Sequence, residues 1–244
     1  MSQPVLLDAF CGAGGATRGY QLAGFRVVGV DITDQPRYCG EEFHRGDAID
    51  FIRQHGHEFD AIHASPPCQA HTAVQTMWKR DHPNLIPATR EALEATGLPW
   101  VIENVPGAPM RKDLVLCGSM FPELRDGDYG LIRHRWFEFS DPALAPVLVP
   151  SCNHAPVTVS VFGHGGHVYH GVEQWRRVMG IDWATRDEIA QAIPPAFTEL
   201  VGRCFLQAVE ARTEALFPDK SWKHSIACAW HEGQSCTCKE KAAA

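Results

Sequence analysis

The chain has 244 residues, a formal net charge of −7 at pH 7, 45% hydrophobic residues and 21% charged residues. This composition excludes a disordered chain, and the length predicts one large domain or one domain with a small appendage. The sequence has neither an apolar run of about 18 residues nor a signal-like N-terminus, so we expect a cytoplasmic protein without a membrane partner.

The net charge and the cysteines further limit the class of protein to which the chain can belong. The acidic balance argues against a protein that coats nucleic acid over its whole surface, although a local basic cleft is compatible with it. The nine cysteines are an odd number at irregular spacing. Without a signal peptide they indicate free thiols, a metal site or a nucleophile, and not a disulfide framework.

Short apolar runs alternate with helix-like stretches through most of the chain. Strands are predicted at residues 4–10, 26–31, 59–64, 99–102, 114–117 and 136–139. Helices are predicted at residues 16–23, around 50–53 and at 89–96, 173–179 and 195–216. This alternation predicts an α/β fold with a doubly wound, mostly parallel sheet. In such sheets ligands bind at the carboxyl ends of the strands.

A glycine-rich loop follows the first predicted strand, with the sequence Asp8-Ala9-Phe10-Cys11-Gly12-Ala13-Gly14-Gly15. Glycines there let the backbone approach a ligand closely, but the spacing matches neither the dinucleotide fingerprint nor a Walker loop. Asp31 ends the next strand, where an acid can accept hydrogen bonds from two ribose hydroxyls. Together these features favour a nucleoside cofactor without a pyrophosphate. The alternative is a plain tight turn with a helix-capping aspartate.

The segment Ser65-Pro66-Pro67-Cys68-Gln69 follows the apolar run at 59–64. The two prolines restrict the backbone and hold the next residue in a defined place. A cysteine held over a ligand crevice is a candidate nucleophile, and its thiolate is the reactive form. The alternative is an inert buried thiol.

Two further polar pieces belong to the predicted strands. Glu103 ends the strand at 99–102, and partial burial there would raise its pKa and let it protonate a ring nitrogen or hold an amino group. Arg133 and Arg135 are two residues apart before an aromatic strand, so we expect them on one face, where they could bind a phosphate or a base carbonyl. A solvated acid and a surface pair of arginines are the alternatives.

These pieces occur in the order Phe10-Cys11-Gly12-Ala13-Gly14-Gly15, Pro67-Cys68-Gln69, Glu103-Asn104-Val105 and Arg133-His134-Arg135. With them the chain resembles the cytosine-5 DNA methyltransferase family over roughly residues 4–140 and 172–206. The resemblance implies the S-adenosylmethionine-dependent methyltransferase fold and methyl transfer to C5 of a flipped cytosine. It implies that Cys68 attacks C6 and that Glu103 engages N3 and the 4-amino group. It implies that Arg135, with Arg133, contacts O2 and steadies the thiolate.

The resemblance also implies a site for S-adenosylmethionine. In it Phe10 packs on the adenine or the sulfonium, Asp31 binds the ribose, Ile32 lies against adenine and Asp47 takes the adenine amino group. Gln191 stands, after Ala190, where the family usually has Gly-Asn. The remaining cofactor residues that the resemblance implies are Gly12, Gly14, Gly15 and Pro67.

The family normally carries a long target-recognition region before its ninth motif, and here only residues 141–171 are available. We expect residues 1–140 to form the catalytic and cofactor-binding core and 172–217 to form helices that return to it. Thirty residues cannot form a sizeable subdomain, so we expect low or very short sequence specificity. DNA is the expected partner of a monomeric enzyme, and the segment 70–84 is expected to close on it. The alternatives are an RNA or other pyrimidine methyltransferase, and a non-catalytic nucleic-acid-binding relative.

Soft metal ligands gather in the tail at 218–244. They are Cys228, His231, Cys236 and Cys238. Zinc favours four such ligands in a tetrahedron, so the tail is a candidate zinc site, and an exposed tail with reactive thiols is the alternative. The histidines of residues 164–170 could contact phosphates or a metal, or belong to a flexible loop.

Overall fold

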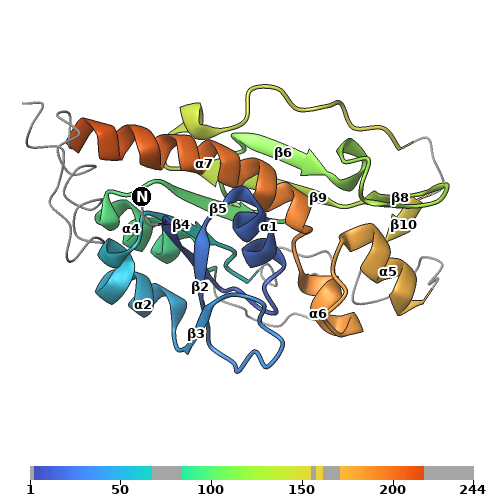
Figure 1. The fold of residues 1–244 in the computed structure, drawn as a ribbon, viewed down its shortest axis with the longest axis horizontal. Coiled ribbons are helices and arrows are strands. Elements are labelled where there is room, and N and C mark those ends of the chain that lie inside the picture. Colours follow the sequence, from blue (N-terminus) through green and yellow to red (C-terminus); the bar gives the residue numbers. More distant parts are fainter. Residues whose placement is uncertain (1–2, 68–83, 155–157, 162–170, 217–244) are drawn as a thin grey trace, which may run out of the picture.

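The computed structural model describes residues 3–67, 84–154, 158–161 and 171–216 (Figure 1). Four features predicted from the sequence therefore lie outside the described residues. They are the nucleophile Cys68, all but the last residue of the segment 70–84, the histidines of 164–170 and the tail from 218. Among the helices within the described ranges, none is both long and apolar enough to span a membrane.

A seven-stranded sheet forms the centre of the molecule, in the order β3-β2-β1-β4-β5-β9-β6. Its strands are β1 (Val5–Ala9), β2 (Arg26–Asp31), β3 (Glu42–Arg45), β4 (Ala61–Ala64), β5 (Trp100–Asn104), β6 (Leu114–Cys117) and β9 (His134–Phe139). The first five strands are mutually parallel, and β9 is antiparallel to both β5 and β6. The order reverses between β1 and β4, and an open sheet of this kind binds ligands at that point.

Helices cover both faces of the sheet, as the alternating pattern predicts (Figure 1). Their bounds are α1 (Gly15–Ala23), α2 (Ala48–His55), α4 (Ile86–Thr96), α5 (Val172–Met179), α6 (Arg186–Gln191) and α7 (Pro195–Leu216). One core joins α1 and α7 through Tyr20, Phe197 and Phe205, and the other joins α2 and α4 through Ile52 and Leu93. Because both faces are covered, β4 and β5 are buried along their whole length.

A small second sheet and several short turns complete the described chain. The second sheet has the order β10-β8-β7 and contains β7 (Arg125–Asp126), β8 (Tyr129–Ile132) and β10 (Thr158–Ser160). The 3-10 turns are η1 (Gly56–Glu58), η3 (Gly118–Met120) and η4 (Pro142–Leu144). The second sheet, β3 and α6 were not predicted, because they are short and lack a clear apolar period.

Helices α1 and α7 approach each other closely at Gly19. A Cβ atom at Gly19 would collide with the Pro195 carbonyl and the Thr198 hydroxyl of α7. We expect Gly19→Ala to lower the free energy of unfolding by about 1–3 kcal/mol, because overpacking outweighs the gain of about 1 kcal/mol in helix propensity. Gly46→Ala is the matched control, since an added Cβ at Gly46 meets nothing within 4 Å. Urea unfolding of the two variants tests this, and equal stabilities would contradict it.

Candidate active site

Three polar segments converge where β1, β4 and β5 end. The glycine loop follows β1, Ser65-Pro66-Pro67 follows β4, and Glu103 and Asn104 form the end of β5. The Asn104 side chain donates a hydrogen bond from Nδ2 to the Pro66 carbonyl over 2.9 Å, and both residues are buried. This bond ties the chain that leads into Cys68 to the strand that carries Glu103. This role of Asn104 was not predicted from the sequence.

The glycine loop is held in a strained conformation beside Asp31. Phe10 has φ 62°, which is rare for a bulky residue, and its amide donates to the Val30 carbonyl over 2.9 Å. The Gly12 amide donates to Oδ2 of Asp31 over 3.0 Å. Gly12 has φ +50°, and a Cβ there would meet nothing within 4 Å. The loop therefore presents open backbone next to a carboxylate, which suits a ribose.

Gly14 and Gly15 are required for packing independently of any ligand. A Cβ at Gly14 would lie 2.7 Å from Cys39 Sγ, and one at Gly15 would lie 2.5 Å from the Ile193 carbonyl oxygen. Gln191 is exposed at the end of α6, two residues before Ile193. The residues after α6, at Ile193, therefore pack directly against the glycine loop. Cofactor contacts of Gly14, Gly15 and Gln191 stay predictions.

The other predicted cofactor residues surround Asp31 or lie at the same edge of the sheet. Ile32 is 64% exposed directly after Asp31, so an apolar surface adjoins the carboxylate. Asp47 caps α2 and accepts from the amides of Ile49 and Asp50 at 2.9 and 3.0 Å. The cap accounts for Asp47 without a ligand, so its contact with adenine stays a prediction. Pro67 is exposed at the end of the described segment after β4.

Glu103 and Arg135 form a buried pair across β5 and β9. The Arg135 Nε atom lies 2.8 Å from Oε1 of Glu103, and the side chains are 11% and 6% exposed. Within the described part of the chain, Oε1 of Glu103 takes part in this ion pair but accepts no hydrogen bond. Burial raises the pKa of Glu103, and Arg135, Arg133 and a hydrogen bond from Ser65 offset only part of this effect. The pair thus presents an acceptor and a carboxyl that retains its proton to higher pH than usual.

Arg133 holds a buried place directly before β9. It is 3% exposed. Its guanidinium donates to the carbonyls of Val161, Ala190 and Ala192 at 2.6 to 2.8 Å. Arg133 therefore holds three backbone segments together, and a face shared with Arg135 stays a prediction. Its predicted contact with a base finds no support in these bonds.

A buried polar chain leads from α1 to the end of β4. The Tyr20 hydroxyl lies 2.9 Å from Nδ1 of His63, and Nε2 of His63 lies 2.7 Å from the Ser65 hydroxyl. Burial lowers the pKa of His63 to about 3, so the imidazole is neutral at physiological pH. Ser65 is thereby fixed beside Pro66. In the sequence, the only indication of these hydrogen bonds was His63, a single histidine in an apolar run.

Asp8 is buried on β1, and we expect it to make the stability of the folded protein depend on pH. Burial raises its pKa to about 7, although the Thr17 hydroxyl donates to it over 2.5 Å. Because the unfolded pKa is about 3.9, the folded state loses stability as pH rises from about 4 through 7. We expect Asp8→Asn to gain stability relative to the wild type between pH 4.5 and 8, by roughly 3 kcal/mol.

Urea unfolding at both pH values measures this gain. Asp47→Asn serves as the matched control, since Asp47 is exposed and asparagine caps a helix as well as aspartate does. His63 acts with the opposite sign in both proteins, because its lowered pKa removes stability as pH falls below about 6.5. A stability difference between Asp8→Asn and the wild type that does not change with pH would contradict the expectation.

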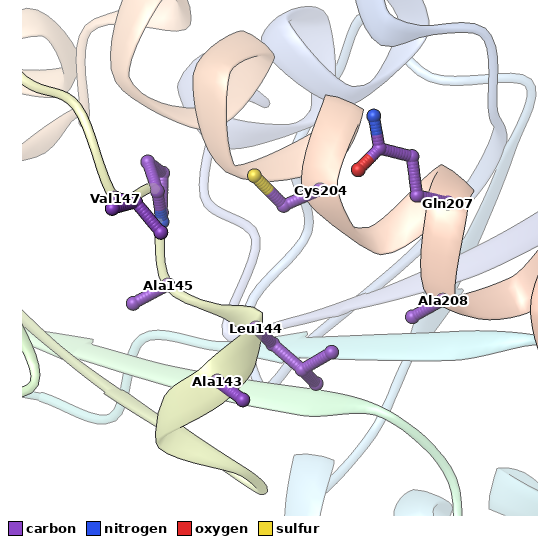
Figure 2. A pocket seen from close by; sticks show the side chains of 8 residues that line it. Ala143, Leu144, Ala145, Val147, Cys204, Gln207 and Ala208 are labelled. Atoms are coloured by element: carbon purple, nitrogen blue, oxygen red, sulfur yellow. The ribbon is translucent and has the colours of Figure 1, made fainter.

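A pocket between residues 143–147 and α7 lies away from this edge (Figure 2). Leu144 and Val147 line one side, and Cys204 and Gln207 of α7 line the other. Phe139 pairs with Val101 near the start of β5, so the chain enters this region at the amino edge of the parallel strands. None of the described residues that line the pocket carries a carboxylate, an imidazole or an amine.

Several solved structures of methyltransferases resemble the fold. One is described as a DNA modification methyltransferase encoded within a prophage of E. coli, with a TM-score of 0.58 and 13% identity over 84% of this chain and 99% of that chain. The S. pombe Dnmt2 methyltransferase has a TM-score of 0.55 and 12% identity over 85% of this chain and 99% of that chain. No family model matches the sequence, and no curated protein matches it. The chain has the fold of S-adenosylmethionine-dependent methyltransferases, with a mostly parallel sheet between helices.

Proposed function

We propose that this protein transfers a methyl group from S-adenosylmethionine to C5 of cytosine in DNA. The observation that carries the proposal is the buried Glu103–Arg135 pair at the carboxyl end of β5, joined through Asn104 to the residues just before Cys68. A carboxyl with a raised pKa, a guanidinium and a thiol are the groups needed to activate a pyrimidine ring. A binding protein would not need all three.

The residues around β1 and β2 fit the cofactor. Asp31 offers a carboxylate to ribose hydroxyls, Ile32 an exposed apolar surface to adenine, and Gly12 an open backbone position. Phe10 lies at the strained turn between this surface and the end of β4. When bound, S-adenosylmethionine supplies an electrophilic methyl group. In the proposal these residues hold it over the crevice between β1 and β4.

The reaction follows from the three catalytic groups. The Cys68 thiolate adds to C6, while Glu103 donates a proton toward N3 or holds the 4-amino group and Arg135 contacts O2. These contacts let the ring accept electron density, so that C5 becomes the nucleophile that takes the methyl group. The C5 proton then passes to water, and its bonding electrons re-form the C5–C6 double bond while Cys68 leaves as a thiolate. Arg133 serves as a positioning residue through the carbonyls of Val161, Ala190 and Ala192.

The domain division of the sequence analysis is part of the proposal. Residues 1–140 and 172–217 form the catalytic unit, and 141–171 form a short recognition segment. Because this segment is small, we propose low or short sequence specificity. Bisulfite sequencing of treated DNA tests this point, and a strict recognition site of four or more bases would refute it.

A covalent trap tests the proposed function. Oligonucleotides that contain 5-fluorocytosine cannot lose the C5 substituent, so an enzyme of this class stays attached to them after methyl transfer. The purified full chain with S-adenosylmethionine is expected to form a stable adduct with such DNA. An adduct with the matching RNA but not with DNA would identify the protein as an RNA methyltransferase. No adduct with either would favour a non-catalytic nucleic-acid-binding protein.

A further inference from the structure

Four side chains of the types that bind metals in proteins meet beside the candidate active site. They are Cys117, His134, Cys152 and His154, and one ligand atom from each lies within 4.8 Å of all the others. We propose that this cluster is a structural zinc site that fastens the segment after β9 to the catalytic sheet. The proposal does not rest on the proposed function, and it differs from the zinc site predicted in the tail.

The sheet register brings the first two ligands together. Cys117 and His134 are directly paired across β6 and β9, so their side chains project from the same face. Arg135 follows His134 and projects from the opposite face, toward Glu103. The metal-ligand cluster and the Glu103–Arg135 pair therefore lie at the same end of β9, on opposite faces of the sheet.

The remaining distances fit a tetrahedral ion. Cys152 Sγ lies 2.7 Å from Nε2 of His154 and 3.4 Å from Nε2 of His134. Cys117 Sγ lies 3.3 Å from Nε2 of His154. Zinc–sulfur bonds of about 2.3 Å and zinc–nitrogen bonds of about 2.0 Å place neighbouring ligand atoms roughly 3.3 to 3.8 Å apart. Shifts on the order of 1 Å or less would seat the ion.

The donor set selects zinc over harder cations. Two thiolates and two imidazoles form a set typical of closed zinc sites, whereas magnesium and calcium prefer oxygen ligands. The Ser119 hydroxyl lies 3.4 Å from both sulfurs and accepts from the Asn153 amide over 3.2 Å. A hydroxyl in this position orients and stabilises the thiolates. With four protein ligands and no open position, the role is structural.

The site accounts for how a short segment is held in place. The chain leaves β9 at the amino edge of the sheet and returns at Cys152 to the opposite edge, where β9 begins. A few residues later β10 pairs with β8, and the Val161 carbonyl receives the Arg133 guanidinium. Segments too small to bury a core depend on such cross-links. Zinc at this point would anchor the chain just before the residues that hold Arg133.

Metal analysis of the full chain tests the proposal. Cys152→Ser, at an exposed position, is expected to hold one zinc per chain fewer than the wild type and to unfold at a lower temperature. The half-buried Cys204 on α7 and Cys236 of the tail provide matched Cys→Ser controls, and Cys204→Ser is expected to keep the full metal content. Equal zinc content in the wild type and Cys152→Ser, including none in either, would overturn the proposal.

Cobalt spectroscopy tests the ligand set without altering it. In Cys236→Ser the described cluster is intact, and cobalt substituted for zinc is expected to show tetrahedral bands and thiolate charge transfer of two sulfur ligands. Octahedral bands, or charge transfer from a different number of thiolates, would contradict a site made of Cys117, His134, Cys152 and His154. This measurement decides the matter even if Cys152→Ser fails to fold.

Discussion

Replacing Cys68 by serine is expected to abolish methyl transfer while the protein still binds S-adenosylmethionine. The thiolate is the nucleophile of the proposed reaction, and a serine hydroxyl without an adjacent base is a far weaker one. The cofactor residues around Asp31 belong to β1, β2 and the loops that follow them, so cofactor affinity is expected to change by less than about threefold. Activity is measured by transfer of labelled methyl groups, and binding by calorimetry.

Cys204→Ser is the matched control for this experiment. Cys204 is half-buried on α7 beside the pocket of Figure 2, away from the carboxyl edge. We expect this variant to keep the wild-type rate and to form the adduct with 5-fluorocytosine DNA, whereas Cys68→Ser forms none. Methyl transfer by Cys68→Ser at a rate near that of the wild type would contradict covalent catalysis.

Glu103→Gln is expected to lower kcat by about 10²- to 10⁴-fold with little change in cofactor affinity. Glutamine has nearly the shape of glutamic acid but cannot deliver a proton, and loss of a general acid typically costs this factor. The raised pKa of Glu103, which burial causes, keeps the proton available in the wild type. The wild-type rate is therefore expected to fall as pH rises through this pKa. The residual rate of Glu103→Gln is expected not to show this fall.

The chain offers a second buried glutamate as a control. Glu138 lies on the neighbouring strand β9, is fully buried and receives two hydrogen bonds of 2.7 Å from Arg90. It is paired with Ile102 across the strands, so it projects from the face opposite Glu103. Glu138→Gln is expected to lower stability but to leave the turnover of the folded protein near the wild-type value. Equal losses of kcat in both variants would remove the catalytic assignment of Glu103.

Much of the fold could be predicted because its signals are local. The apolar runs at 4–10 and 99–102 predicted the buried parallel strands β1 and β5, and the order of strands and helices predicted their arrangement. The strand Glu42–Arg45 was not predicted, because its residues are mostly polar and exposed or half-buried and its conformation depends on pairing with β2. The positions of Asp31 and Glu103 at the ligand-binding edge could be predicted, because the carboxyl ends of parallel strands lie at one edge of the sheet.

The roles of residues that contact segments distant in the sequence could not be predicted. Arg133 binds carbonyls at Ala190 and Ala192, 57 and 59 residues further along the chain, and no local pattern reveals that contact. The four ligands of the proposed zinc site come from β6, β9 and the loop around Cys152, so no short spacing connects them. The Cys-Asn-His sequence at 152–154 was a signal, but it supplies only two of the four ligands.

The fate of the C5 hydrogen tests the central claim most directly. DNA labelled with tritium at C5 of cytosine is incubated with the protein and S-adenosylmethionine, and the released tritium and the methylated nucleoside are both quantified. The account predicts one tritium released to water for each methyl group transferred, with 5-methyldeoxycytidine as the product. Methylation with the tritium retained, as for transfer to an exocyclic nitrogen, would contradict it.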